Sequence, residues 1–172
     1  DAHMRSDQDN AIRILEQSAR FLFLTGAGMA ADSGIPTFRG RVGFWNRFPV
    51  YAGLGLRPEE LATGTGFTQH PERSWGFYEW RRRNAACNQP HAGYAAINAL
   101  LKQYDGFILT TNTDGYHLRS GAPSERVYEI HGSMWRLQCI DGHRSLVWDN
   151  TDVPLCDLNE EAMLVAEESM PR

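Results

Sequence analysis

The sequence predicts a parallel α/β fold, on three features of its pattern. Short apolar segments at 21–25, 106–112 and 126–130 are typical of strands buried in a parallel sheet. Helical patterns lie between them, at 70–84 and 91–104. Each strand is followed by glycines or polar residues, and in such sheets ligands bind beyond the carboxyl ends of the strands. We therefore expect a sheet with helices on both faces and a ligand site along one edge.

The first part of the chain predicts a helix followed by a strand. Residues 7–20 carry Ile12, Leu15 and Ala19 at helical spacing. The segment FLFLT (21–25) is short, continuous and apolar, which indicates a buried strand.

The middle of the chain changes from loop to helix. Residues 40–70 are rich in glycine and lack a steady period, so we expect a loop with one short helix at 58–62. Residues 70–84 bring aromatic side chains together at helical spacing, and residues 91–104 are apolar around most of a helix. The acidic last part of the chain predicts at most one helix, at 159–168.

Composition excludes several classes of partner. The chain has 172 residues, 42% of them hydrophobic, and a formal charge of −4, which indicates a globular domain without general affinity for nucleic acid or membranes. Three cysteines do not suggest a disulfide framework, so we expect a cytoplasmic location.

Residues 1–9 are interpreted as a tag remnant and leader, with Asp1 to His3 ahead of a native Met4.

The strand at 21–25 runs directly into a glycine turn, GAGMAA (26–31). This order fits the G-x-G-x-x-G/A pattern of dinucleotide-binding turns. Gly26 permits the tight turn, Gly28 lets the backbone approach a pyrophosphate, and the small Ala31 allows a helix to pack closely on the sheet. A tight turn in an α/β domain that binds no ligand is the alternative.

The loop after this turn differs from that of hydride-transfer enzymes. Those enzymes hold the ribose with an acid about 20 residues downstream. Here no Asp or Glu lies between Asp32 and Glu59. The chain continues instead to Phe38 and Arg39, and we expect this loop to fold over a ligand.

Three segments, taken in order, resemble the sirtuins, the NAD-dependent protein deacylases. They are GAGMAADSGIPTFRG (26–40), TTNTDGYHLRSG (110–121) and YEIHGSMWRLQC (128–139), and the family's usual forms are GAGxSxxSGIPxFR, TQNIDxLHxxAG and ElHGxxxxxxC. The resemblance covers roughly residues 10–139. It implies a deacetylase, desuccinylase or demalonylase that uses NAD, releases nicotinamide and forms O-acyl-ADP-ribose from an acyl-lysine protein or peptide.

The resemblance also implies roles for residues after the second and third strands. His131 becomes the general base that takes a proton from a ribose hydroxyl, a task that suits an imidazole. Asn112 orients the ribose and a water, and Asp114 binds the nicotinamide carboxamide. His117 belongs to the same motif and is expected to be structural. The alternatives are a capping or core histidine for His131 and Asx turns for Asn112 and Asp114.

The remaining cofactor contacts are expected in the glycine turn and the loop after it. Within that loop, Phe38 shields the reactive face and Arg39 aids the cofactor contacts. The residues expected to bind NAD are Gly26, Ala27, Gly28, Ala31, Thr37, Phe38, Arg39, Thr111, Asn112 and Asp114.

The chain departs from the family's pattern at four of these positions or their neighbours. Ala30 replaces a serine, Thr37 an aspartate that is often present, and Thr111 and Thr113 replace glutamine and isoleucine. Such side chains normally touch the cofactor or its surroundings, so we expect altered cofactor affinity or acceptor choice.

Tyr78 and Arg81 lie three residues apart, on one face of the helix predicted at 70–84. A phenol beside a guanidinium suits a carboxylate. Sirtuins that prefer succinyl-, malonyl- or glutaryl-lysine carry a Tyr-x-x-Arg pair on this helix. Aromatic packing beside a solvated basic face is the alternative.

Sirtuins usually carry a small zinc module with two C-x-x-C pairs. This chain keeps Cys139 but lacks the second cysteine of that pair, and Cys156 has no such neighbour. Four ligands are not assembled, so Cys139 is left as a candidate ligand and no occupied zinc site is predicted.

The resemblance divides the chain into three parts. Residues 1–9 are the leader, residues 10–138 are a Rossmann-like core with an inserted helical segment at about 41–90, and residues 139–172 begin a smaller helical or zinc-type module that is incomplete. We expect either a longer natural chain or a second chain that completes the fold.

Two other functions stay open at this point. Thr37 and Thr111 are compatible with an NAD hydrolase or ADP-ribosyltransferase. The incomplete core is compatible with a non-catalytic module that binds NAD or ADP-ribose.

Overall fold

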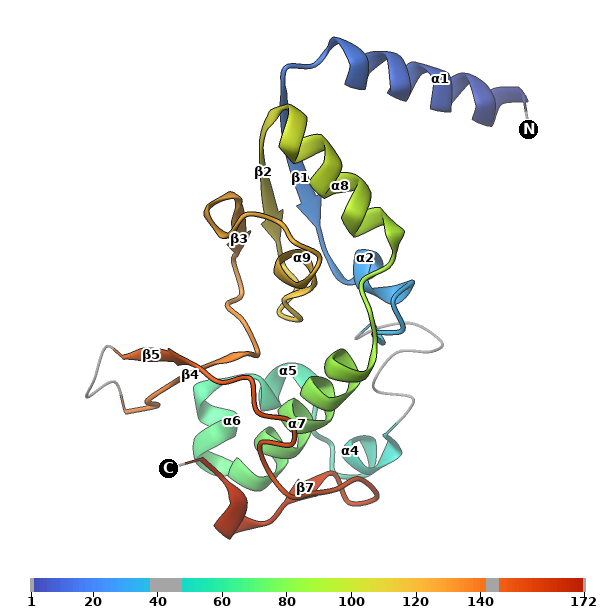
Figure 1. The fold of residues 1–172 in the computed structure, drawn as a ribbon. Coiled ribbons are helices and arrows are strands. Elements are labelled where there is room, and N and C mark those ends of the chain that lie inside the picture. Colours follow the sequence, from blue (N-terminus) through green and yellow to red (C-terminus); the bar gives the residue numbers. More distant parts are fainter. Residues whose placement is uncertain (1, 38–47, 142–145, 172) are drawn as a thin grey trace.

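A three-stranded parallel sheet organises one part of the molecule. The structure, a computed structural model, describes residues 2–37, 48–141 and 146–171. The strands, in spatial order, are β1 (Arg20–Thr25), β2 (Asp105–Thr110) and β3 (Val127–Glu129). The predicted parallel sheet is thus confirmed, and β1 and β2 point towards a lobe of helices (Figure 1).

Helix α8 (Ala92–Gln103) packs on one face of this sheet, as its apolar sequence predicts (Figure 1). Leu101 of α8 is buried with Ile108 of β2 and with Ala122. Full burial of an aliphatic side chain stabilises a fold by about 1.5–3 kcal/mol. This cluster therefore fixes α8 against the strands.

The opposite face of the sheet stays open within the described residues. Leu22, Leu24, Phe107 and Tyr128 alternate with buried or half-buried side chains and are 63%, 70%, 43% and 60% exposed. Helix α1 (Ala2–Gln17) extends away from the sheet and does not lie across this face (Figure 1). The expectation of helices on both faces is met on one face in this part of the chain.

A lobe of helices lies beyond the carboxyl ends of β1 and β2 (Figure 1). Its helices are α4 (Pro49–Gly53), α5 (Pro58–Leu61), α6 (Gly64–Gln69) and α7 (Pro71–Cys87). Helix α5 confirms the short helix predicted at 58–62, whereas α4 and α6 replace part of the expected loop. Helix α6 forms because the Thr63 hydroxyl caps it, accepting from the Gly66 amide at 3.0 Å, and because Phe67 packs edge-on against Trp75 of α7.

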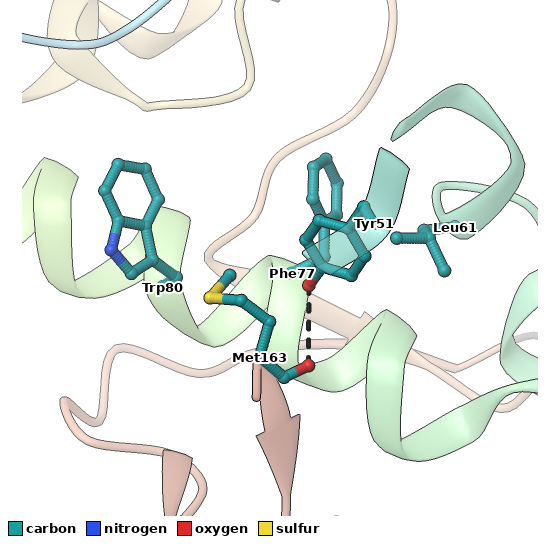
Figure 2. Close-up of a cluster of buried hydrophobic side chains, with 5 residues drawn as sticks. All are labelled: Tyr51, Leu61, Phe77, Trp80 and Met163. Atoms are coloured by element: carbon teal, nitrogen blue, oxygen red, sulfur yellow. Dashed lines mark hydrogen bonds between the residues drawn. The ribbon is translucent and has the colours of Figure 1, made fainter. Parts of the chain in front are cut away.

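The core of this lobe joins segments far apart in the sequence. Tyr51, Leu61, Phe77, Trp80 and Met163 form one buried cluster (Figure 2). The Tyr51 hydroxyl donates to the carbonyl of Met163 at 3.5 Å. The cluster therefore fixes the last part of the chain on α7.

The remaining elements are short. They are α2 (Ala27–Ala31), α9 (Tyr116–Arg119), η1 (Ser124–Arg126), β4 (Arg136–Gln138), β5 (Val147–Asp149), β6 (Leu158–Asn159), β7 (Leu164–Val165) and η2 (Glu167–Ser169). Strands β4 and β5 pair antiparallel, as do β6 and β7. The helix expected at 159–168 is wrong. Residues 160–163 form the turn between β6 and β7, where Met163 has a φ of 50°, and Met163 and Val165 are both buried beside α7. A helix through this segment would break the antiparallel pairing of β6 with β7.

Arg82 connects α7 to the segment after β5. Its side chain is 1% exposed and donates to the carbonyls of Met134, Asn150 and Asp152 and to the Asn150 side chain. The guanidinium also lies 4.9 Å from the centre of the Trp135 ring.

Among the described helices, none is both long and apolar enough to cross a bilayer.

Candidate functional site

The register of the sheet brings three strand ends to one edge. Thr25 of β1 lies beside Thr110 of β2, which lies beside Glu129 of β3. The strands are parallel, so the segments that follow them leave at the same edge. Those segments are the glycine turn, residues 111–114 and residues 130–132.

The glycine turn offers exposed backbone at this edge. Gly28 is exposed, and a Cβ there would meet nothing within 4 Å. A Cβ at Gly26 would lie 3.0 Å from the Thr111 hydroxyl, so the turn and the loop after β2 approach closely. Exposed glycine backbone is what a pyrophosphate needs, and these residues fit a dinucleotide.

Two small residues in α2 exchange their expected positions. Ala31, expected to pack a helix on the sheet, is exposed. Ala30 is 1% exposed and takes the buried position instead. The inward face of this one-turn helix thus falls one residue earlier than the motif suggests.

Asn112 links the loop after β2 to the glycine turn. Its Nδ2 donates to the carbonyl of Gly26 at 2.9 Å, and its own amide donates to the Thr110 hydroxyl at 3.1 Å. The Thr111 amide donates to the Thr25 carbonyl at 3.1 Å, and the Thr111 side chain is exposed. The structure therefore brings two predicted cofactor segments into direct contact.

Asp114 lies deeper than Thr111 and Asn112 before it, at 4% exposure. Its carboxylate accepts from the Tyr116 amide at 2.9 Å, and its carbonyl accepts from Trp135 Nε1 at 2.6 Å. Burial raises the pKa of this carboxyl, and the Tyr116 amide and the charges of Arg81 and Arg119 offset part of that rise. The Asx turn considered from sequence is therefore present at Asp114.

His131 follows β3 and its side chain is exposed at the same edge. The Gly132 amide donates to the Glu129 carbonyl at 3.0 Å, and Gly132 has a φ of 72°, which favours glycine. The Met134 amide then donates to the Thr113 carbonyl at 3.0 Å. This tight turn presents His131 beside the loop that carries Asn112 and Asp114.

His117 has the structural role expected from sequence. It is 3% exposed, and its Nε2 lies 2.8 Å from the Thr25 hydroxyl. Burial lowers the pKa of this imidazole to about 4. Neutral His117 thus connects α9 to the end of β1.

Tyr78 and Arg81 lie together on α7, as their spacing predicts. The Arg81 guanidinium carbon is 5.5 Å from the centre of the Tyr78 ring and 5.2 Å from that of Phe77. Arg81 Nη2 donates to the Thr113 hydroxyl at 3.0 Å. The Tyr78–Arg81 pair on α7 therefore borders the predicted cofactor loop, which follows β2.

Three of the other predicted cofactor residues lie after the glycine turn, and one lies in it. Ala27 is exposed within the turn, and Thr37 is half-buried after it. Phe38 and Arg39 lie outside the described residues.

The described residues do not fit a zinc site. Among residues 2–37, 48–141 and 146–171, no three His, Cys, Asp or Glu side chains are grouped so that they could hold a metal. Cys139 is half-buried, Cys87 is exposed and Cys156 is buried. No chemical step is assigned to zinc.

Comparison with known proteins identifies the family. The model of the Sir2 family matches residues 26–162. The chain belongs to the Sir2 family. The match includes the glycine turn, the loop after β2 and His131, so the resemblance seen in the three motifs is confirmed.

Relatives of this Sir2 chain are named NAD-dependent protein deacylases. That of Aquifex aeolicus is 39% identical over 126 residues, which are 73% of this chain and 48% of the relative. That of Daphnia pulex is 33% identical over 97% of this chain and 62% of its own length. The chain spans about half the length of the first of these relatives.

Solved Sir2 structures share the fold. A Sir2 homologue in complex with NAD matches with a TM-score of 0.70 and 30% identity, over 91% of this chain and 58% of that one. A Sir2 homologue mutant bound to 2′-O-acetyl ADP-ribose matches with a TM-score of 0.70 and 34% identity, over 84% and 54%. The Rossmann-like α/β fold predicted from sequence is confirmed.

Sequence reasoning missed Thr113 as a contact of the Tyr78–Arg81 pair. In the sequence, Thr113 is only a departure from the isoleucine of the TQNID motif. A hydroxyl in place of an aliphatic side chain was the available signal, because it can accept a hydrogen bond from a neighbouring arginine. The sequence did not predict which arginine would reach it.

Proposed function

We propose that the protein is an NAD-dependent protein-lysine deacylase. The observation that carries the proposal is the convergence, at one sheet edge, of the glycine turn, Asn112 and His131. Family membership and the names of the relatives support it.

Each residue at this edge has its own role in the proposed reaction. NAD, when bound, supplies a glycosidic bond between nicotinamide and ribose that can be broken. The exposed backbone at Gly28 receives the pyrophosphate, and Asn112 orients the ribose. Asp114 and its neighbouring backbone hold the carboxamide, and the His131 imidazole takes a proton from a ribose hydroxyl.

The substrate proposed is an acyl-lysine protein whose acyl group ends in a carboxylate. Arg81 offers a planar fork that matches a carboxylate, and the Tyr78 hydroxyl offers a further hydrogen bond. Contact between Arg81 and Thr113 puts this pair next to Asn112, which supports an acyl group reaching the cofactor side of α7. A cytoplasmic location and completion of the fold by a second chain remain predictions from sequence.

The test is nicotinamide release by the full-length protein with acetyl-lysine and succinyl-lysine peptides. We expect release that depends on peptide, and a loss of about 100-fold or more in His131→Ala, since general acid–base groups contribute that much. His70→Ala is the matched control, because His70 is also exposed but lies at the start of α7.

Three outcomes would contradict the proposal. Nicotinamide release without peptide would favour an NAD hydrolase or ADP-ribosyltransferase. NAD binding without turnover of either peptide would favour a binding module. Equal losses in His131→Ala and His70→Ala would remove the role of His131 as base.

A further inference from the structure

The contact between α7 and the cofactor loop points to a residue that sets acyl specificity. We propose that Thr113 is a positioning residue: its hydroxyl holds the Arg81 guanidinium where it meets the carboxylate of an acidic acyl group. This role rests on the proposed deacylase function and deepens it, because it concerns how one class of acyl group is selected.

The Arg81 side chain is fixed from two directions. Its Nη2 donates to the Thr113 hydroxyl at 3.0 Å, and its guanidinium carbon lies within 5.5 Å of two ring centres on its own helix, Phe77 and Tyr78. A long arginine side chain loses rotamer freedom when it binds a ligand, and a side chain already held in place loses less. The hydroxyl therefore favours carboxylate binding without touching the carboxylate.

Thr113 is suited to this role because its own backbone is fixed. Its carbonyl accepts from the Met134 amide at 3.0 Å. The preceding residue, Asn112, is bound to the carbonyl of Gly26, and the following residue, Asp114, accepts from the Tyr116 amide. The hydroxyl thus projects from a point held by hydrogen bonds on both sides.

The same geometry sets the position of the acyl group relative to the cofactor. Arg81 belongs to the helical lobe, whereas Asn112 belongs to the sheet edge. The Arg81–Thr113 hydrogen bond is a direct link between these two parts. A carboxylate bound at Arg81 is therefore held at a defined distance from the loop that orients the ribose.

The chemistry of threonine allows a clean test. Thr113→Val keeps the β-branched shape and removes the hydroxyl, whereas Thr113→Ser keeps the hydroxyl. A guanidinium carries five N–H donors, so a bond to Thr113 is compatible with a forked bond to a carboxylate. Loss of the hydroxyl should then affect peptides with an acidic acyl group more than acetyl peptides.

The experiment compares kcat/KM of the full-length protein for succinyl-lysine and acetyl-lysine peptides. We expect Thr113→Val to lower the succinyl-to-acetyl ratio by about fivefold, mainly through the KM of the succinyl peptide, as suits the loss of one hydrogen bond of typical strength. Thr113→Ser should keep the ratio within about twofold. In an Arg81→Ala background, Thr113→Val should cause no further change in the ratio.

Each contrary result has a separate meaning. Equal losses for both peptides, or failure of the serine variant to retain the ratio, would overturn the positioning role. A further fall of the ratio in the Arg81→Ala background would also overturn it, because Thr113 would then act without Arg81. A wild-type protein that turns over neither peptide would refute the proposed function itself, and one that prefers acetyl-lysine would refute the acidic acyl class and this role with it.

Discussion

Replacement of His117 should change how the stability of the protein depends on pH. The imidazole is 3% exposed, and burial lowers its pKa to about 4 from the ordinary 6.5. The folded state therefore favours neutral His117, whereas the unfolded chain takes up a proton once the pH falls below about 6.5.

The sign and size of the effect follow from this difference. A lowered pKa contributes stability that is complete above pH 6.5 and is lost as the pH falls towards 4. The difference between 6.5 and about 4 corresponds to about 3 kcal/mol of unfolding free energy. His117→Gln cannot titrate, and its amide nitrogen can still meet the Thr25 hydroxyl. Its stability should therefore fall less than that of the wild type between pH 7 and pH 4, by about 3 kcal/mol.

The assay is urea unfolding followed by tryptophan fluorescence at pH 7, 6, 5 and 4. Burial raises the pKa of Asp114 and Glu129, and their contributions run in the opposite direction with pH. Both groups are present in wild type and variant, so the difference between the two curves isolates His117. His70→Gln, at an exposed position, serves as control for the loss of a histidine as such. Parallel curves for His117→Gln, or an NMR titration midpoint of His117 near its ordinary value, would refute the reasoning.

Two further substitutions, the second with a control variant, test the packing around the site. Arg82→Lys should destabilise the protein by about 2–4 kcal/mol in urea unfolding, because an ammonium cannot replace a buried fork that serves several carbonyls, and an unchanged midpoint would contradict this. Gly115→Ala should cost about 1–3 kcal/mol, since Gly115 has a φ of 72° and a Cβ there would lie 2.9 Å from the Trp135 ring. Gly64→Ala, where a Cβ would meet nothing within 4 Å, should change stability by less than about 0.5 kcal/mol, and a similar cost in both glycine variants would remove the steric explanation.

The position of the site could be predicted because it depends on local pattern. Apolar segments followed by polar residues predicted β1, β2 and β3, and parallel strands end at one edge. That rule places the glycine turn, Asn112 and His131 together without any knowledge of side-chain contacts. The helices of the lobe were harder to predict. Helix α6 depends on a Thr63 cap and on Phe67 packing against α7, both within a stretch whose glycines suggest a loop.

The open face of the sheet shows that an apolar pattern can predict a strand without predicting what packs on it. A strand with one wet face alternates polar and apolar residues, whereas FLFLT is apolar at both sets of positions. The pattern is therefore that of a strand covered on both faces. Within the described residues α8 covers Ile108, while Leu24 on the other face is 70% exposed. The periodicity predicted the strand correctly, but it carries no information on which segment covers each face.

The link between Arg81 and Thr113 was beyond sequence reasoning for a different reason. The helical spacing of Tyr78 and Arg81 is a property of one element, and the TQNID-like loop is a property of another. Which hydroxyl meets which guanidinium depends on how α7 docks beyond the sheet edge, and that docking depends on distant contacts such as Arg82 with the segment after β5. A threonine in place of isoleucine has no evident purpose in the loop alone. Its hydroxyl gains a partner only once α7 is in place. Under the proposed function, this departure from the family's pattern is therefore the feature that would couple acyl selection to cofactor binding.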